Sequence, residues 1–214
     1  MIWRRSEPEP QLSLSTTSIL NRWATLADIA MTHSHGTLFK VPGCHVEHLQ
    51  LEDTAALQTL LEKSSDYSQL VTGSPPGLSA AYSLLTDYPE GKTPNDKFVI
   101  GISTELKDLI GVLDVIRDYP AQHDWWLGLL LFDPKYRGQG LGQQVYRAFE
   151  QWVSQQGAQR VYLGIVEQNQ RAHQFWQTMG FEAVEKRHAR RFGNVEHVVI
   201  VMVRTLTRQA TPSS

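Results

Sequence analysis

The stretch at residues 133–146 reads DPKYRGQGLGQQVY and places a glycine at every second position after Arg137: Gly138, Gly140 and Gly142. Glycine loses more backbone freedom on folding than any other residue, so a cluster of glycines marks backbone that turns sharply or closely approaches another group. The apolar run LGLLLF at 127–132 precedes the cluster, and apolar residues at helical spacing follow it. The stretch therefore predicts a strand, a glycine-rich turn and a helix.

A helix that begins at such a turn suits an anion. The first N–H groups of a helix have no partner within the helix, and the helix dipole is positive at that end. Bare glycine backbone lets phosphate oxygens come close to these N–H groups. Arg137 adds a permanent charge on a planar fork that matches phosphate oxygens. The sequence predicts a phosphate-bearing ligand here.

The spacing of the glycines excludes two common nucleotide sites. A dinucleotide site needs G-x-G-x-x-G. Counted from Gly138, the third glycine of that motif would stand at position 143, which is Gln143, whereas the chain has its third glycine one residue earlier, at Gly142. The triplet at 91–93, GKT, imitates the end of a triphosphate-binding loop. There, however, the required earlier glycine is replaced by Thr86, and Pro94 blocks helix growth.

Composition restricts the class of protein. The chain has 214 residues, 41% of them hydrophobic and 20% charged, and a net charge of -2, which is ordinary for a globular domain. This balance gives no general attraction to nucleic acid or to an anionic membrane, and the one basic run, KRHARR at 186–191, is interpreted as a solvated face. We therefore expect no nucleic-acid partner.

Two further features indicate the compartment. The single cysteine, Cys44, excludes an internal disulfide and fits a reducing environment. The run at 127–132 is the longest apolar run and falls far short of the roughly 18 residues that suggest a membrane span. The N-terminus, MIWRRSEPEP, lacks the apolar region of a signal peptide. We expect a cytoplasmic protein without a membrane partner.

The chain divides into three parts. Residues 1–42 are expected to form a partly disordered N-terminal extension with one short helix, and Met31 is an alternative start. Residues 43–206 are expected to form one domain, and residues 207–214 a disordered tail.

Within the domain, periodicity predicts seven strands and four helices. The strands are expected at 45–51, 97–103, 108–116, 125–132, 161–166, 182–189 and 195–204. The helices are expected from Asp53, from Ser74 to Leu85 with Leu78, Ala81, Tyr82 and Leu85 buried, from about Gly140 to Gly157, and from Gln170 to Gly180. This order predicts a mixed α/β sheet.

Two blocks of sequence resemble the GNAT superfamily of N-acetyltransferases. Residues 137–142, RGQGLG, match its Q/R-x-x-G-x-G/A signature. About 30 residues later, Asn169, Ala172, Phe175 and the pair Gly180-Phe181 resemble its N-x-x-A-x-x-F-Y-x-x-x-G-F pattern. The resemblance covers about residues 43–205 and implies a mostly antiparallel sheet of roughly six to seven strands, flanked by about four helices, with a V-shaped opening between the two central strands.

The resemblance also implies acetyl-CoA as the donor, with no metal. Backbone amides at 137–142 would hold its pyrophosphate, the opened strand at 130–132 would pair with the pantetheine arm, and Asn169 would fix that arm. Asn169 is equally well placed to cap the following helix. The residues implied around acetyl-CoA are Leu130, Leu131, Phe132, Arg137, Gly138, Gln139, Gly140, Leu141, Gly142, Asn169, Phe175 and Trp176.

Acetyl transfer needs a neutral amine, but an alkyl amine with a pKa near 10 is mostly protonated at pH 7, so a nearby base is useful. The candidate carboxylates are Asp114, Asp118, Asp124 and Glu167. An isolated carboxylate is more often a solvated surface group. Asp114 is singled out because it lies within the apolar run GVLDVI.

The residue after Phe175 breaks the family pattern. The resemblance implies a tyrosine there that protonates the CoA sulfur, whereas this chain has Trp176, whose indole N–H does not release its proton. Another group or a water would then return the proton, with Tyr67, Tyr162 and His173 as candidates. Asp114, Glu167 and Tyr67 are the catalytic residues that we expect.

Two other groupings are interpreted as structural. Trp125 and Trp126 could stack on a substrate, but one of two adjacent strand residues faces the core, so packing is favoured. His33, His35, His45 and His48 do not share one face of one element, so no metal site is expected.

The sequence thus predicts an enzyme that moves an acetyl group from acetyl-CoA to a primary amine of a small molecule or peptide. Acidic residues near the expected acceptor site slightly favour a cationic acceptor. One alternative is a non-catalytic acyl-CoA-binding module, and another is an interaction protein that docks through residues 1–42. The oligomeric state, including a homodimer, is left open.

Overall fold

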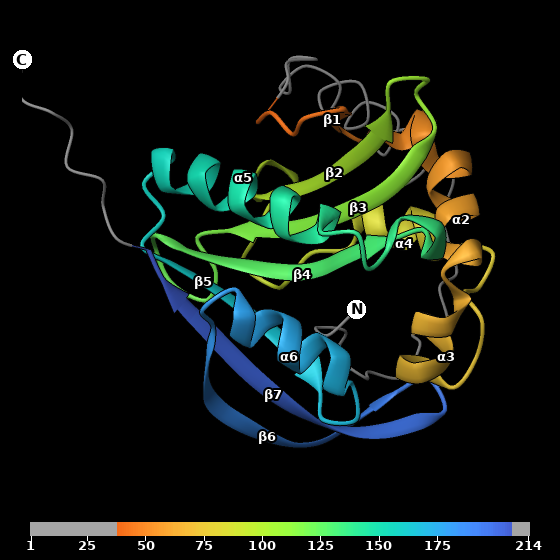
Figure 1. The fold of residues 1–214 in the computed structure, drawn as a ribbon. Helices are drawn as coiled ribbons and strands as arrows, with labels where there is room; N and C mark the ends of the chain where they lie inside the picture. Colours follow the sequence, from red (N-terminus) through yellow and green to blue (C-terminus); the bar gives the residue numbers. More distant parts are fainter. Residues whose placement is uncertain (1–37, 207–214) are drawn as a thin grey trace, which may run out of the picture.

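The computed structural model describes residues 38–206 (Figure 1). The strands are β1 (Cys44–His48), β2 (Lys97–Thr104), β3 (Leu109–Arg117), β4 (Asp124–Phe132), β5 (Arg160–Val166), β6 (Glu182–Phe192) and β7 (Val195–Thr205). The helices are α2 (Thr54–Lys63), α3 (Ser65–Thr72), α4 (Ala80–Thr86), α5 (Leu141–Gln155) and α6 (Gln170–Thr178). Short 3-10 turns lie at Leu51–Asp53, Pro94–Asp96 and Pro134–Tyr136.

Within residues 38–206 the strands form one seven-stranded sheet in the order β1-β2-β3-β4-β5-β7-β6. Every neighbouring pair is antiparallel except β4 and β5, which are parallel. Apolar side chains alternate along the strands, so Leu113 and Val115 face the core under α5 and α6, while Val112 faces α2 and α4. Figure 1 shows these two groups of helices around the sheet. The mixed, mostly antiparallel fold class is confirmed.

The two central strands separate partway along their length. β4 and β5 pair only from Asp124 opposite Arg160 to Leu127 opposite Leu163. Beyond these residues β4 runs on to Phe132 and β5 to Val166 without pairing to each other. The V-shaped opening that the family resemblance implied is therefore present between β4 and β5.

A β-bulge lies where the separation begins. Asp114 of β3 is opposite Leu129 of β4, but the next residue, Val115, is opposite Leu127, so Gly128 is the extra residue. The bulge changes the alternation of β4, because Trp126 and Leu129 then face the same side of the sheet although they are three residues apart. It thereby turns the last part of β4 relative to its first part.

The start and the buried face of the helix expected over 74–85 are wrong, although a helix is present in the second half of that range. α4 begins only at Ala80, Leu78 is 96% exposed and Tyr82 is 53% exposed, while Leu84 rather than Leu85 is buried with Ala81. The reason is the pair Pro75-Pro76, because a residue that precedes a proline is disfavoured in helical conformation. The missing turn of helix is replaced by a loop.

That loop follows α3, a helix that the sequence analysis did not predict. The sequence of α3, SDYSQLVT, has Tyr67, Leu70 and Val71 at helical spacing, but the helix is only eight residues long and Val71 is its one buried residue. Two other expectations are confirmed. The chain reverses at Gly193 and Asn194 to form the hairpin between β6 and β7. Trp125 and Trp126 pack in separate cores on opposite faces of the sheet.

The expected boundary at residue 43 needs an extension, because Phe39 and Val41 are already buried in the core. The short helix expected in the N-terminal extension, Met31, His33, His35 and the expected tail lie outside the described residues. Among residues 38–206, no helix is both long and apolar enough to cross a membrane.

Candidate functional site

The glycine-rich turn joins β4 to α5 with its backbone exposed. Gly138 and Gly140 have φ values of 77° and 82°, the left-handed region that favours glycine. A Cβ atom added at either glycine would meet no atom within 4 Å. The helical hydrogen bonds begin with the Gln143 and Gln144 amides, which both donate to the Gly140 carbonyl. The amides ahead of them form an exposed, positively polarised end of the helix.

A cavity of about 560 Å³ lies against this turn, and we refer to it as the loop cavity. It brings together ten of the twelve residues expected around acetyl-CoA: Leu130, Leu131, Phe132, Arg137, Gly138, Gly140, Gly142, Asn169, Phe175 and Trp176. The other two do not line it. The Gln139 side chain instead donates to the Lys135 carbonyl, and Leu141 packs against the core.

Arg137 does not present a free fork to the loop cavity. Its Nε donates to the Phe132 carbonyl at 2.7 Å, and its two terminal nitrogens hold both carboxylate oxygens of Asp66. The hydrogen bonds from Arg137 lower the pKa of the Asp66 carboxyl. Arg137 therefore ties the turn to the end of β4 and to α3. Arg171, at the start of α6, also lines the cavity, and the sequence analysis did not predict this cation.

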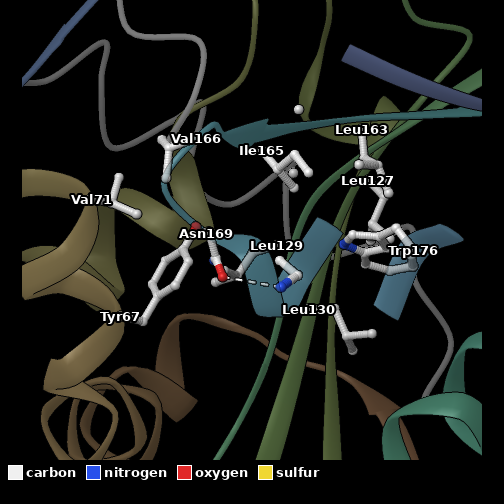
Figure 2. A pocket seen from close by; sticks show the side chains of 13 residues that line it. Tyr67, Val71, Leu127, Leu129, Leu130, Leu163, Ile165, Val166, Asn169 and Trp176 are labelled. Atoms are coloured by element: carbon white, nitrogen blue, oxygen red, sulfur yellow. Dashed lines mark hydrogen bonds between the residues drawn. The ribbon is translucent and has the colours of Figure 1, made fainter. Parts of the chain in front are cut away.

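A second, smaller cavity of about 120 Å³ fills the opening between β4 and β5, and we refer to it as the splay cavity. Figure 2 shows Tyr67 of α3 on one side, Trp176 of α6 on the other, and Asn169 between them. The Asn169 side chain accepts a hydrogen bond from the Ala172 amide at 3.1 Å, so its expected capping role is confirmed. Asn169 lines the loop cavity as well.

A third cavity, of about 320 Å³, lies between α3, α4 and the sheet, and we refer to it as the α3–α4 cavity. It shares Val71, Gly128 and Leu129 with the splay cavity, which in turn shares Leu130, Asn169, Ala172 and Trp176 with the loop cavity. Tyr67 lines all three. The cavities therefore adjoin one another, from the glycine turn, through the opening in the sheet, to α4.

Asp114 lines the α3–α4 cavity and is buried, contrary to the general interpretation of such carboxylates as surface groups. Lys97 of β2, also buried, donates to it at 2.7 Å. Burial raises the pKa of the Asp114 carboxyl, and the neighbouring Lys97 opposes this rise. Asp124 is buried too, but Arg160 holds both of its oxygens, at 2.7 and 3.0 Å.

Replacing Lys97 by methionine is expected to destabilise the protein by about 3–5 kcal/mol, because Asp114 is left buried without its partner. The pKa of Asp114 then rises further, so the folded state holds a proton that the unfolded state releases above pH ~3.9. The stability loss should thus be small near pH 4 and grow toward pH 8. Thermal unfolding across that range measures it.

The double variant Lys97→Met, Asp114→Leu is the control, since removing both charges restores an apolar pair. A pH-independent loss in the single variant, or no recovery in the double variant, would show that the ion pair is not the cause.

Tyr67 combines a central position with an unusual hydroxyl. Burial of this hydroxyl raises its pKa to about 12, with the Asp114 charge as a smaller cause. The remaining candidates lie elsewhere: Tyr162 stacks on Trp126, and neither Tyr162 nor His173 lines any of the three cavities. Glu167 is exposed, pairs with Lys186 at 2.6 Å and does not line them either.

His197 of β7 is a buried residue that the sequence analysis missed. Its Nε2 donates to the Val71 carbonyl at 3.0 Å, and its Nδ1 lies 2.9 Å from the side-chain amide of Gln168. Beside it, the Asn194 amide donates to the Thr72 carbonyl at 2.9 Å. These contacts fasten the end of α3 to the β6–β7 hairpin and to the loop before Asn169. No local pattern predicts them, since His197 and Val71 are 126 residues apart.

Metal binding has no counterpart in this geometry. Among residues 38–206, no group of three or more His, Cys, Asp or Glu side chains is arranged to hold a metal ion. The site is built instead from exposed backbone, apolar walls and a few hydroxyl and carboxyl groups.

Residues 59–181 match the model of the acetyltransferase (GNAT) family, and the chain belongs to this family. The uncharacterized N-acetyltransferase YobR of Bacillus subtilis is 28% identical over 81 residues, which are 38% of this chain and 31% of that relative. The match thus spans about a third of the relative's length.

Solved structures share the fold. An acetyltransferase from Thermus thermophilus has a TM-score of 0.63 at 24% identity, covering 78% of this chain and 99% of that one. A spermidine N-acetyltransferase from Vibrio cholerae, in complex with CoA and spermine, has a TM-score of 0.62 at 14% identity, covering 78% and 97%. At these identities the likeness concerns the fold alone.

Proposed function

We propose that this protein transfers the acetyl group of acetyl-CoA to a primary amine of a small molecule or peptide. The observation that carries the proposal is the row of three adjoining cavities at the opening between β4 and β5. A long donor can lie on one side of this opening and an acceptor on the other, so that the two meet beside Tyr67. Membership of the acetyltransferase family supports this direction of chemistry.

The loop cavity has the features needed for CoA. Backbone amides at 138–142 and the positive end of α5 suit the pyrophosphate, and the open space at Gly138 and Gly140 admits it. The β4 backbone beyond Leu127 lacks a partner on β5, so it can pair with the amides of the pantetheine arm. The Phe132 carbonyl is excluded from this role, because Arg137 and Ser64 already donate to it. Phe175 and Trp176 form the apolar wall.

The residues around the splay cavity define what the protein can contribute to the transfer. The Tyr67 hydroxyl stays protonated across the physiological range, because its pKa is about 12. It can therefore donate a hydrogen bond to the developing oxyanion or to the departing sulfur without losing its proton. Asp114 lines the cavity on the acceptor side, and we assign it the role of orienting or deprotonating the amine. Glu167 receives no role here, because it lines none of the three cavities and pairs with Lys186.

Replacing Trp176 by phenylalanine should leave the rate of acetyl transfer within roughly tenfold, because the indole N–H is not a proton source. Phenylalanine keeps an aromatic wall against Tyr146 and Phe181, which both contact Trp176 edge to face. Single-turnover rates at saturating acetyl-CoA measure the effect. A larger collapse of the rate, with the melting temperature unchanged, would assign Trp176 to the chemistry.

A thiol-release assay tests the function itself. The full chain is incubated with acetyl-CoA and an amine and peptide library, and the acetylated products are identified by mass. Release of CoA thiol that depends on an amine supports the enzyme. Tight CoA binding without turnover on any amine would instead favour the non-catalytic acyl-CoA-binding module.

A further inference from the structure

The lining of the α3–α4 cavity is mainly apolar. Its walls include Leu61, Val71, Ala80, Leu84 and Leu129, together with the two prolines of the loop after α3. Thr72 contributes little polarity, because its hydroxyl already donates to backbone carbonyls at Ser68 and Ser74. An acceptor that enters here meets mainly apolar surface.

The charge of this cavity is close to zero. Of the described side chains that line it, Asp114 alone carries a charge, and Lys97 offsets that charge at 2.7 Å. A polycationic acceptor would have to bring further charges into a space of about 320 Å³ that offers them no counterion. Placing an unpaired charge in such surroundings costs several kcal/mol. The geometry therefore disfavours polyamines, although the fold is shared with a spermidine N-acetyltransferase.

The cavity also lacks a strong base. Tyr67 remains protonated, and Asp114 is a carboxylate held by Lys97. At pH 7.5 an alkyl amine of pKa ~10.4 is neutral in about 0.1% of molecules, whereas an α-amino group of pKa ~7.8 is neutral in about a third. The difference is roughly 250-fold in the reactive form. A site with weak bases is thus best served by an amine that is already partly neutral.

We propose that the acceptor is an α-amino group carried on an apolar body with no second charge. This inference rests on the proposed function and names its acceptor class. This acceptor class replaces the cationic acceptor that the sequence favoured. The reason is that Asp114, the acidic side chain that lines the cavity, is already paired with Lys97.

The transfer forms one bond and breaks another, and each proton is accounted for. The neutral nitrogen of the α-amino group attacks the thioester carbonyl carbon, a C–N bond forms, and the C–S bond breaks. The proton that the nitrogen loses ends on the CoA sulfur, directly or through Asp114 or water, so the products are the amide and free CoA thiol. No oxidant or reductant is involved.

Three acceptors with one matched side chain test the inference on the full chain. Leucinamide carries an α-amino group on an apolar body, isopentylamine carries the same body with a strongly basic amine, and spermidine is a polycation. We expect kcat/KM at pH 7.5 to be about 100-fold higher for leucinamide than for isopentylamine, following their neutral fractions, and lowest for spermidine. The rate with leucinamide should level off above pH ~8, while that with isopentylamine should keep rising to pH ~10.

A variant checks the charge argument separately. Ser68 lines the cavity and is half-buried, so Ser68→Asp adds a negative charge that no cation offsets. It should raise kcat/KM for spermidine relative to leucinamide at least tenfold, and Ser68→Asn, of similar size without the charge, should not.

The outcomes separate the two proposals. If spermidine or isopentylamine is preferred by the unaltered protein, the acceptor class is wrong while acetyl transfer stands. If CoA binds but none of the amines is acetylated, acetyl transfer itself is wrong and the acceptor class falls with it.

Discussion

The variant Gly140→Val is expected to raise the dissociation constant of CoA about 100-fold, or about 2.7 kcal/mol. Gly140 has a φ of 82°, a conformation that is costly for a β-branched residue, and it precedes the first residue of α5. The valine side chain would enter the open space next to the helix-start amides, which is the space proposed for the pyrophosphate. Isothermal titration with CoA measures the affinity, and thermal unfolding measures the stability.

Gly157→Val is the matched control. Gly157 lies just beyond the other end of α5, has a φ of 86°, and a Cβ atom added there would meet no atom within 4 Å. The two variants therefore impose the same backbone strain and differ in their distance from the turn. We expect a similar loss of stability in both and a loss of CoA affinity only in Gly140→Val. If Gly140→Val and Gly157→Val lose the same CoA affinity, the glycine turn has a structural role and does not bind CoA.

The second large effect is expected from Tyr67→Phe, which should lower kcat about 100-fold, the usual cost of losing one donor to a developing oxyanion. The ring that lines all three cavities is kept, so CoA affinity should change little. Because the pKa of Tyr67 is about 12, its hydroxyl remains a donor up to strongly alkaline pH. The fold-loss in kcat should therefore be constant from pH 6 to pH 10.

Tyr82→Phe is the comparison for this variant, because Tyr82 is 53% exposed on α4 and does not line the three cavities. It should retain the activity of the unaltered protein. A Tyr67→Phe variant with full kcat, or with a loss that disappears at pH 10, would remove Tyr67 from the proposed mechanism.

The parts of the fold that the sequence predicts are those with a local cause. The glycine turn is fixed by left-handed conformations at Gly138 and Gly140, which a short sequence displays directly. The strands and the amphipathic α5 show the periodicities of their kind. By contrast, α3 is eight residues long and buries one apolar residue, so its helical spacing is a short and weak signal. The helix expected from Ser74 begins only at Ala80, because a residue that precedes a proline is disfavoured in helical conformation.

The candidate site divides in the same way. Its backbone part, the loop and the opened β4, could be predicted, because two sequence blocks define it. Its side-chain part depends on contacts between distant residues: Lys97 meets Asp114 through the register of β2 and β3, and Arg137 meets Asp66 across 71 residues. Such pairs neutralise a charged side chain and occupy its hydrogen-bonding atoms, and the local sequence does not show them. Arg137 is an example, because its terminal nitrogens hold Asp66 and do not form the free fork that the sequence predicted.

The fastening of α3 to the β6–β7 hairpin has a consequence for the order in which the site is assembled. A growing chain can complete β4, the glycine turn and α5 before β7 exists, and domains are commonly folded during synthesis from the N-terminal side. The contacts of His197 and Asn194 with α3 are absent until β7 has been made. β7 also supplies the antiparallel partner of β5. A nascent chain that stops short of β7 thus lacks the contacts that hold α3 beside the opening in the sheet, so the final strand completes the candidate site.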